Sequence, residues 1–277
     1  MTSIRMATLL AAVLLSSPAA VRAGPIQDNS FLIEEAYNQE PGVIQHINTF
    51  ARSVRDGTWG YSFTEEWPVL GQTHQASVTF TALRPDGASA GVGDLALNYR
   101  LQAVGSGDTR VAFAPRLTML VPTGDEKRGL GSGGAGIQVN LPLCIVLAEQ
   151  LVTHLNVGGT YIPSARDATG EKGTSTTFAG GPSLIWLAHP NFNVMCEALY
   201  TTTELKLPAG SDRTETFTVN PGVRGAINFA SGLQIVPGVS VPIGVGPSRG
   251  ERAIFFYLSF EHPFRAAGPT ETPEKRS

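Results

Sequence analysis

Ionisable side chains interrupt the apolar segments of this chain at alternate positions. The stretch LALNYRL at 95–101 places its large apolar residues on one face and Asn98 and Arg100 on the other. A two-residue period is that of a β-strand, whose side chains point alternately to opposite faces of a sheet. The polar faces of such strands are predicted to carry Glu66, Asp94, Arg100, Arg110, Arg116, His154, Glu197, Arg224 and Glu261.

Two kinds of chemistry fit a polar face that carries both signs of charge. Inside a barrel, the charged groups can cross-link the wall as an ion-pair network, or they can surround the path of a small solute. Acidic and basic residues occur in similar number on the predicted faces. The network is therefore the simpler interpretation, and the solute path stays open as the alternative.

A hydrolytic site is a third possibility. His154 and Asn156 share one predicted strand face, and Ser183 is a candidate nucleophile. No nucleophile elbow accompanies these residues, and a single histidine on a strand is more often structural. We therefore predict no catalytic residues and no enzyme activity.

The two cysteines, Cys144 and Cys196, carry no metal signature, because neither has a second cysteine or a histidine at ligand spacing. We predict no metal site and no cofactor. The two residues fall on strands that should not be neighbours, so both are expected to be free thiols.

The two-residue period recurs along most of the chain. Most of these segments reach or exceed the roughly 9–11 residues that cross a bilayer at a tilt, whereas strands of soluble sandwiches are usually shorter. An open sheet edge in lipid would leave backbone groups unpaired, so the last segment is expected to close on the first. The predicted fold is all-β, an antiparallel up-and-down transmembrane β-barrel over residues 43–264, with apolar side chains outward and polar ones inward. Its twelve predicted strands are 43–52, 58–69, 73–83, 91–104, 109–122, 134–148, 151–163, 174–188, 191–203, 214–230, 233–245 and 251–264.

Aromatic residues recur near both ends of these strands. Three pairs are eight residues apart, so both members of a pair face the same way. Eight steps of about 3.3 Å at a tilt near 40° rise roughly 20 Å, close to the apolar band of such barrels. Amphipathic aromatic side chains prefer the membrane interfaces. Two girdles are predicted from the pairs Trp59 and Trp67, Phe178 and Trp186, and Phe192 and Tyr200, with Phe217, Phe229 and Phe264.

The segments outside the predicted barrel differ in character. Residues 1–23 have a basic start, an apolar run and a small-residue cleavage site before Gly24, which indicates a signal peptide. The run is too short for a spanning anchor, which needs roughly 20 residues. Residues 24–42 are predicted to contain a short helix over 30–40, either a plug in the barrel mouth or a periplasmic cap. Residues 265–277 are predicted to be a disordered polar tail.

The charge balance limits the partners. The chain has 20 basic and 23 acidic residues, and loss of Arg5 and Arg22 with the signal peptide leaves a net charge of −5. Nucleic acid is therefore not an expected partner. For an exported barrel we expect outer-membrane lipids, the barrel-assembly machinery and a small-molecule solute as partners, in the outer membrane of a Gram-negative bacterium.

Four segments together resemble a known family of outer-membrane proteins associated with phenol meta-pathway degradation, which includes transporter-like members. They are FLIEEAYNQE at 31–40, YSFT at 61–64, GVGD at 91–94 and LVPTGD at 120–125. The resemblance implies a barrel that takes up aromatic or hydrophobic compounds, and it transfers no catalytic or binding residue. The expected function is an outer-membrane channel or transporter for small solutes. An outer-membrane lipid hydrolase and a non-conducting structural barrel are the alternatives.

Overall fold

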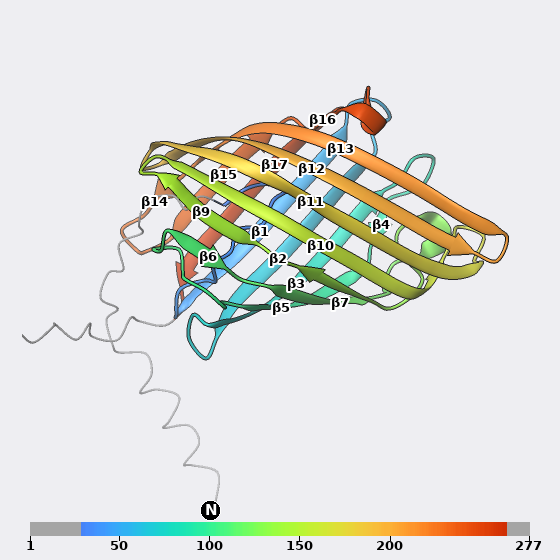
Figure 1. The fold of residues 1–277 in the computed structure, drawn as a ribbon, viewed down its shortest axis with the longest axis horizontal. Coiled ribbons are helices and arrows are strands. Elements are labelled where there is room, and N and C mark those ends of the chain that lie inside the picture. The colour runs from blue at the N-terminus through green and yellow to red at the C-terminus, as the bar shows by residue number, and fades with distance from the viewer. Residues whose placement is uncertain (1–28, 265–277) are drawn as a thin grey trace, which may run out of the picture.

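The computed structural model describes residues 29–264, so the predicted signal peptide, residues 24–28 and the predicted tail lie outside the described range. Strand β1 (Val43–Ser53) pairs on one side with β2 (Trp59–Val69) and on the other with β17 (Ala253–Pro263). This pairing closes the sheet into a barrel of 12 antiparallel strands, as predicted (Figure 1). We call the end where β1 begins and β17 ends the proximal end, and the opposite end the distal end.

Short breaks divide several of the strands, and three of the breaks contain a proline: Pro115, Pro142 and Pro242. Proline has no backbone N–H and cannot donate to a neighbouring strand, so the ladder is interrupted there. The remaining strands are β3 (His74–Arg84), β4 (Gly91–Val92) with β5 (Leu95–Leu101), β6 (Val111–Phe113) with β7 (Arg116–Val121), β8 (Gly136–Asn140) with β9 (Leu143–Ala148), β10 (Leu151–Arg166), β11 (Lys172–His189), β12 (Phe192–Leu207), β13 (Gly210–Gly225) with β14 (Ile227–Asn228), and β15 (Gln234–Ser240) with β16 (Ile243–Gly244).

Two predicted distal loops are wrong. The sequence predicts connections at 164–173 and 205–213, but strands β10 and β11 continue through half of the first segment and β12 and β13 through most of the second, which extends the barrel wall at its distal end (Figure 1). Lys206, for example, pairs with Thr174 on one side and Ser211 on the other. The polar composition of these segments reflects their exposure to solvent, and it does not prevent backbone pairing.

The helical elements of the described chain are two 3-10 turns, η1 (Glu126–Arg128) and η2 (Gly246–Ser248). No helix within residues 29–264 is long and apolar enough to cross a membrane.

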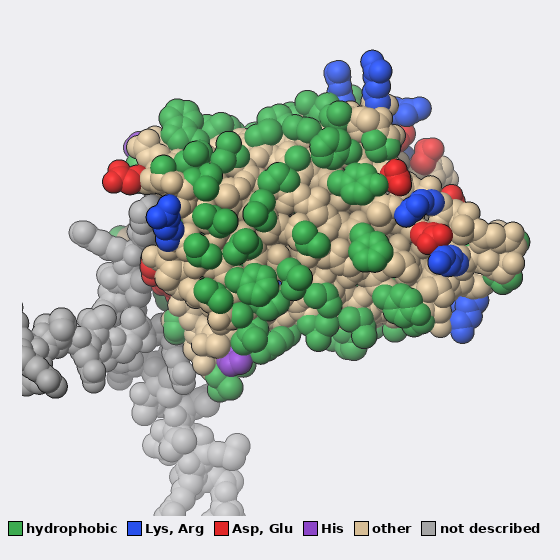
Figure 2. Space-filling view, viewed as in Figure 1, with side chains coloured by type: hydrophobic (Ala, Val, Ile, Leu, Met, Phe, Trp, Pro, Cys, Tyr) green, Lys and Arg blue, Asp and Glu red, His purple; other side chains and the backbone are tan. Residues whose placement is uncertain are grey.

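The two faces of the wall have the predicted chemistry. Large apolar side chains such as Phe178, Val157 and Phe256 are exposed on the outside. Figure 2 shows such side chains spread along the wall, with most charged ones gathered toward the two ends. On the inside, polar side chains such as Gln75 and Asn220 are buried. The cysteines follow this alternation: Cys144 is buried, Cys196 is exposed, and both are free thiols, as predicted.

The N-terminal segment is not the helix that the sequence predicts. Residues 29–40 contain bends and irregular backbone, and they lie inside the barrel against the inner faces of the strands. We call residues 29–39 the lumen segment. Its backbone bonds explain the error: seven of its N–H groups, those of residues 31–34, 36, 38 and 39, donate to side chains of the barrel wall and not to carbonyls one helical turn earlier.

Candidate functional site in the barrel lumen

One buried carboxylate of the barrel wall binds the first part of the lumen segment. Glu197 on β12 is 1% exposed. Its Oε1 accepts hydrogen bonds from the backbone N–H groups of Phe31, Leu32 and Ile33 at 3.0, 2.8 and 2.9 Å. The other carboxylate oxygen accepts from Asn220 at 2.7 Å. Successive N–H groups that converge on one anion form a nest, which holds the backbone of residues 31–33 in place.

We expect Glu197→Ala to detach this part of the segment, because three backbone N–H groups lose their acceptor and each charge-assisted bond contributes about 1.5–3 kcal/mol. The readout is the thiol of Cys144, whose Sγ accepts from the Ala36 N–H at 2.9 Å. In a Cys196→Ser background, a water-soluble maleimide should label Cys144 faster than in the parent. Glu204→Ala, more exposed on the same strand, is the control. An unchanged labelling rate would contradict the anchoring role.

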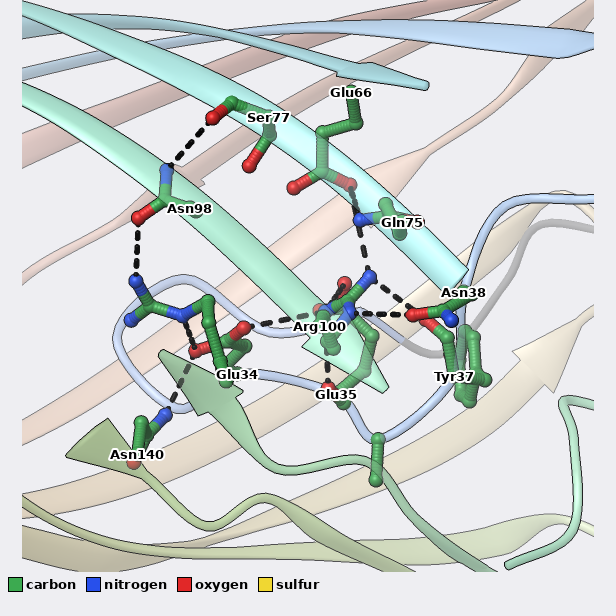
Figure 3. Close-up of polar contacts among 12 residues, drawn as sticks. Glu34, Glu35, Tyr37, Asn38, Glu66, Gln75, Ser77, Asn98, Arg100 and Asn140 are labelled. Carbon is green, nitrogen blue, oxygen red and sulfur yellow. Dashed lines mark hydrogen bonds and ion pairs between the residues drawn. The ribbon is translucent and has the colours of Figure 1, made fainter. Parts of the chain in front are cut away.

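Arg100 on β5 binds the lumen segment through most of its guanidinium. This side chain is 2% exposed. Its Nε donates to Asn38 Oδ1 at 2.9 Å, its Nη2 to the Tyr37 carbonyl at 2.8 Å, and its Nη1 contacts the carboxylates of Glu34 and Glu35 at 3.2 and 3.4 Å. Figure 3 shows both glutamates turned toward Arg100 from the segment. The wall contributes Glu66, 3.7 Å from Nη2.

Glu34 also joins Arg100 to a second guanidinium. Its Oε2 accepts from Arg116 Nε on β7 at 2.9 Å and from Asn140 Nδ2 on β8 at 2.7 Å. Burial by itself raises the pKa of Glu34, but Arg116, Arg100 and the Asn140 hydrogen bond more than offset it, so the pKa lies below its usual value. Glu34 is therefore a carboxylate at neutral pH. The side chain of Asn156 on β10 binds the backbone of Glu34. Its Nδ2 donates to the Glu34 carbonyl and its Oδ1 accepts from the Glu34 N–H, both at 2.8 Å.

An aromatic contact holds the turn of the segment against the opposite wall. The ring of Phe31 lies edge-on to Phe255 and Tyr257 of β17, with centroids 5.6 and 6.0 Å apart. The space for this ring depends on two glycines. A Cβ on Gly222 would lie 2.5 Å from one Phe31 ring carbon, and a Cβ on Gly238 would lie 2.8 Å from another. Only glycine at these positions leaves room for Phe31 as it stands.

The three residues considered for hydrolysis do not form a catalytic arrangement. His154 is fully buried, and its Nδ1 lies 3.2 Å from the Ser30 hydroxyl of the lumen segment. Ser183 accepts from Ser30 at 3.1 Å and from the His154 backbone N–H at 3.3 Å. The Asn156 side chain is engaged with Glu34. All three side chains face the lumen and bind the segment.

Two cavities remain beside the lumen segment. One, of about 220 Å³, lies between the segment and strands β1 to β7 and is lined by Thr49, Thr64 and Asn98 among others. The second, of about 200 Å³, lies toward β8 to β12 and is lined by Asn140 and Leu199 among others. Leu32, Glu34 and Arg116 line both. Residues 32–34, which we call the tip of the lumen segment, thus separate the two cavities.

Neither a protein-family model nor a curated protein matches this sequence. Among solved structures, the chain is similar to an outer-membrane channel from Pseudomonas putida F1, with a TM-score of 0.58 and 14% identity over 89% of this chain and 99% of that one. It is also similar to the NanC porin, with a TM-score of 0.54 and 8% identity over 78% of this chain and 98% of that one. The fold is that of outer-membrane channel barrels. At these identities the likeness extends to the fold alone.

The structure places most of the predicted inward-facing residues along the lumen. Five are buried there: Glu66, Arg100, His154, Glu197 and Arg224. Arg116 and Glu261 are half-buried on inward-facing positions. Asp94 serves the distal connection, where its carboxylate accepts from the Ser132 N–H and hydroxyl at 2.7 and 2.6 Å.

Arg110 departs from the prediction. It is exposed and precedes β6, in the connection at the proximal end, so it does not line the barrel wall. The Arg110 carbonyl still accepts from the Val146 N–H of β9 at 2.8 Å, but Arg110 lies just outside β6, and its side chain reaches solvent at the end of the wall.

The residues of the predicted aromatic girdles lie at outward-facing positions. Phe178, Trp186, Phe192, Tyr200, Phe229 and Phe264 are exposed, and Trp59, Trp67 and Phe217 are half-exposed. Tyr200 stands directly opposite Phe217 on the neighbouring strand, which places two members of one predicted girdle side by side.

Sequence reasoning missed the main partners of the wall charges, because they come from the lumen segment itself. Glu34, Glu35 and Asn38 meet Arg100, and Gln39 donates to Gln45. The signal for this was present in the run EEAYNQE at 34–40, whose acids and amides suit a polar lumen as well as a helix. In residues 29–264, no group of three or more His, Cys, Asp or Glu side chains is placed to hold a metal ion.

Proposed function

We propose that this protein is an outer-membrane channel for small solutes, narrowed by its own N-terminal segment. The observation that carries the proposal is a closed barrel with an apolar outer wall and a polar lumen, in which the space along the axis is occupied by residues 29–39. Cavities of about 200 and 220 Å³ remain on two sides of the segment. A structural barrel that conducts no solute does not require a polar lumen with cavities.

In the proposed setting the apolar wall faces acyl chains and the aromatic residues at its two ends lie at the interfaces. The short proximal connections and the N-terminal segment face the periplasm, and the longer distal connections face the outside. Glu65, which points outward beside His46 at 3.8 Å, then sits near the periplasmic interface, where a charge costs little.

We extend the proposal to aromatic or hydrophobic solutes. The resemblance of segments such as 31–40 and 120–125 to barrels associated with phenol degradation supports it. So does the chemistry beside the lumen segment, where Leu32, Leu199 and Tyr257 line the cavities together with amides and hydroxyls.

The two alternatives fit the geometry less well. A lipid hydrolase needs its nucleophile and base within reach of lipid, but His154 and Ser183 are at most 1% exposed and face the lumen. A non-conducting barrel would show no flux of any solute, with or without the lumen segment.

Uptake into liposomes tests the proposal directly. Vesicles that contain the full mature barrel should take up phenol-sized neutral and charged solutes faster than protein-free vesicles, and should exclude a large oligosaccharide. Equal uptake by both kinds of vesicle, in the full chain and in a chain without residues 24–40, would reject the channel. Phospholipid hydrolysis that disappears in His154→Ala would favour the enzyme instead.

A further inference from the structure

The carboxylate of Glu34 occupies a site that three strands build around it. Arg100 of β5 contacts Oε1 at 3.2 Å, and Arg116 of β7 and Asn140 of β8 donate to Oε2 at 2.9 and 2.7 Å. Two guanidiniums and an amide that converge on one carboxylate make strong, directional, charge-assisted hydrogen bonds. These groups are fixed on paired strands, whereas Glu34 belongs to a segment without regular secondary structure. The barrel wall thus supplies the donors of this site, and the lumen segment supplies the carboxylate that they bind.

The charges around the site select the kind of anion that could replace Glu34. Arg100 also lies near Glu35 and Glu66, at 3.4 and 3.7 Å, so its charge is shared. Arg116 pairs with Glu34, and its remaining partners are the neutral side chains of Asn98, Thr118 and Gln138. Departure of Glu34 would leave Arg116 without a carboxylate at salt-bridge distance, whereas Arg100 would keep Glu35 and Glu66. That is the balance for a monoanion and not for a dianion such as phosphate.

The cavities next to the site limit the size and the charge of the rest of such a solute. Glu34 and Arg116 line both lumen cavities, so a molecule in either one lies beside the same guanidinium. In the cavity of about 200 Å³, these two are the charged residues, and the other lining side chains are mainly hydroxyls and amides, with glycines and the apolar Leu32, Ala179 and Leu199. A small body without further charge fits this wall.

We propose that the lumen contains a binding site for a small monocarboxylate with a compact, largely apolar body, and that Glu34 occupies the site in its absence. The solute carboxylate takes the place of the Glu34 carboxylate on Arg116 and Asn140, and the tip of the lumen segment moves aside. Glu34 thus competes with the transported solute for the same donors, and binding of the solute displaces Glu34. This inference rests on the proposed channel function.

Calorimetric titration of the full mature protein in detergent tests the site with benzoate as the probe and benzyl alcohol as its neutral counterpart. Glu34→Gln removes the competing charge with little change of shape. It should raise the affinity for benzoate by about tenfold or more, the effect of one charge-assisted bond, and leave benzyl alcohol unaffected. Glu40→Gln, the same change at the exposed residue that directly follows the lumen segment, should change neither. Adding Arg116→Gln to Glu34→Gln should abolish the gain.

Three results would overturn the inference: equal affinities for benzoate and benzyl alcohol in Glu34→Gln, a gain that survives Arg116→Gln, or tighter binding of inorganic phosphate than of benzoate. Arg213→Gln, an exposed arginine of β13, controls for loss of a positive charge. Uptake of neutral solutes into liposomes, measured on the same variants, separates the two proposals. Uptake without benzoate selectivity rejects this site alone, and benzoate binding without any uptake rejects the channel alone.

Discussion

Deletion of residues 24–40 should raise the single-channel conductance of the barrel at least about threefold, because ion flux through a pore grows with its open, hydrated cross-section. The segment that disappears fills the lumen, where Ile33, Ala36 and Asn38 are at most 3% exposed. Its removal leaves Arg100, Glu66 and Glu197 facing water. Strand β1 begins at Val43, so the deletion leaves every strand intact.

Planar-bilayer recordings of the full mature barrel and the deleted barrel measure this effect. Maleimide labelling of Cys144 in a Cys196→Ser background provides a second readout, since Cys144 contacts Ala36 and should become accessible in the deleted barrel. Glu40→Gln in the full chain should conduct as the parent does. If the two barrels have the same conductance while Cys144 becomes reactive, the lumen segment does not obstruct the conducting path.

Arg100→Met should lower the free energy of unfolding by about 3–5 kcal/mol, the usual cost of removing one partner from a buried ion pair. The methionine leaves the carboxylates of Glu34, Glu35 and Glu66 without the guanidinium that lies within 3.2 to 3.7 Å of them. It also removes the hydrogen bond that Arg100 Nη2 donates to the Tyr37 carbonyl. The loss is measured by denaturant unfolding of the barrel in lipid or detergent.

A double-mutant cycle with the deletion identifies where this stability resides. In the barrel without residues 24–40, Arg100→Met removes only the contact with the wall residue Glu66, so its cost should fall markedly. Arg84→Met, at an exposed position near the end of β3, should cost little in either background. Equal costs of Arg100→Met in both backgrounds would mean that Arg100 stabilises the wall and not the lumen segment.

The alternation of side chains made the wall predictable residue by residue. It placed Arg100, Glu197 and Arg224 inward and Phe178 and Trp186 outward, because a strand offers only two directions and one of them is apolar. The same rule failed at Arg110, just outside β6, and it could not show that β10 to β13 continue past their apolar portions. Backbone pairing depends on the neighbouring strand, which the local sequence of one strand does not contain.

The sequence by itself determined the barrel: the strand period, the sidedness of the wall and the number of strands. Only the tertiary structure decided what the lumen holds. Residues 31–40 have a composition that also suits a helix, and their conformation depends on acceptors such as Glu197, which is 166 residues from Phe31 in the chain. Long-range partners satisfy the backbone of the lumen segment, so its path exists only once the wall has closed around it.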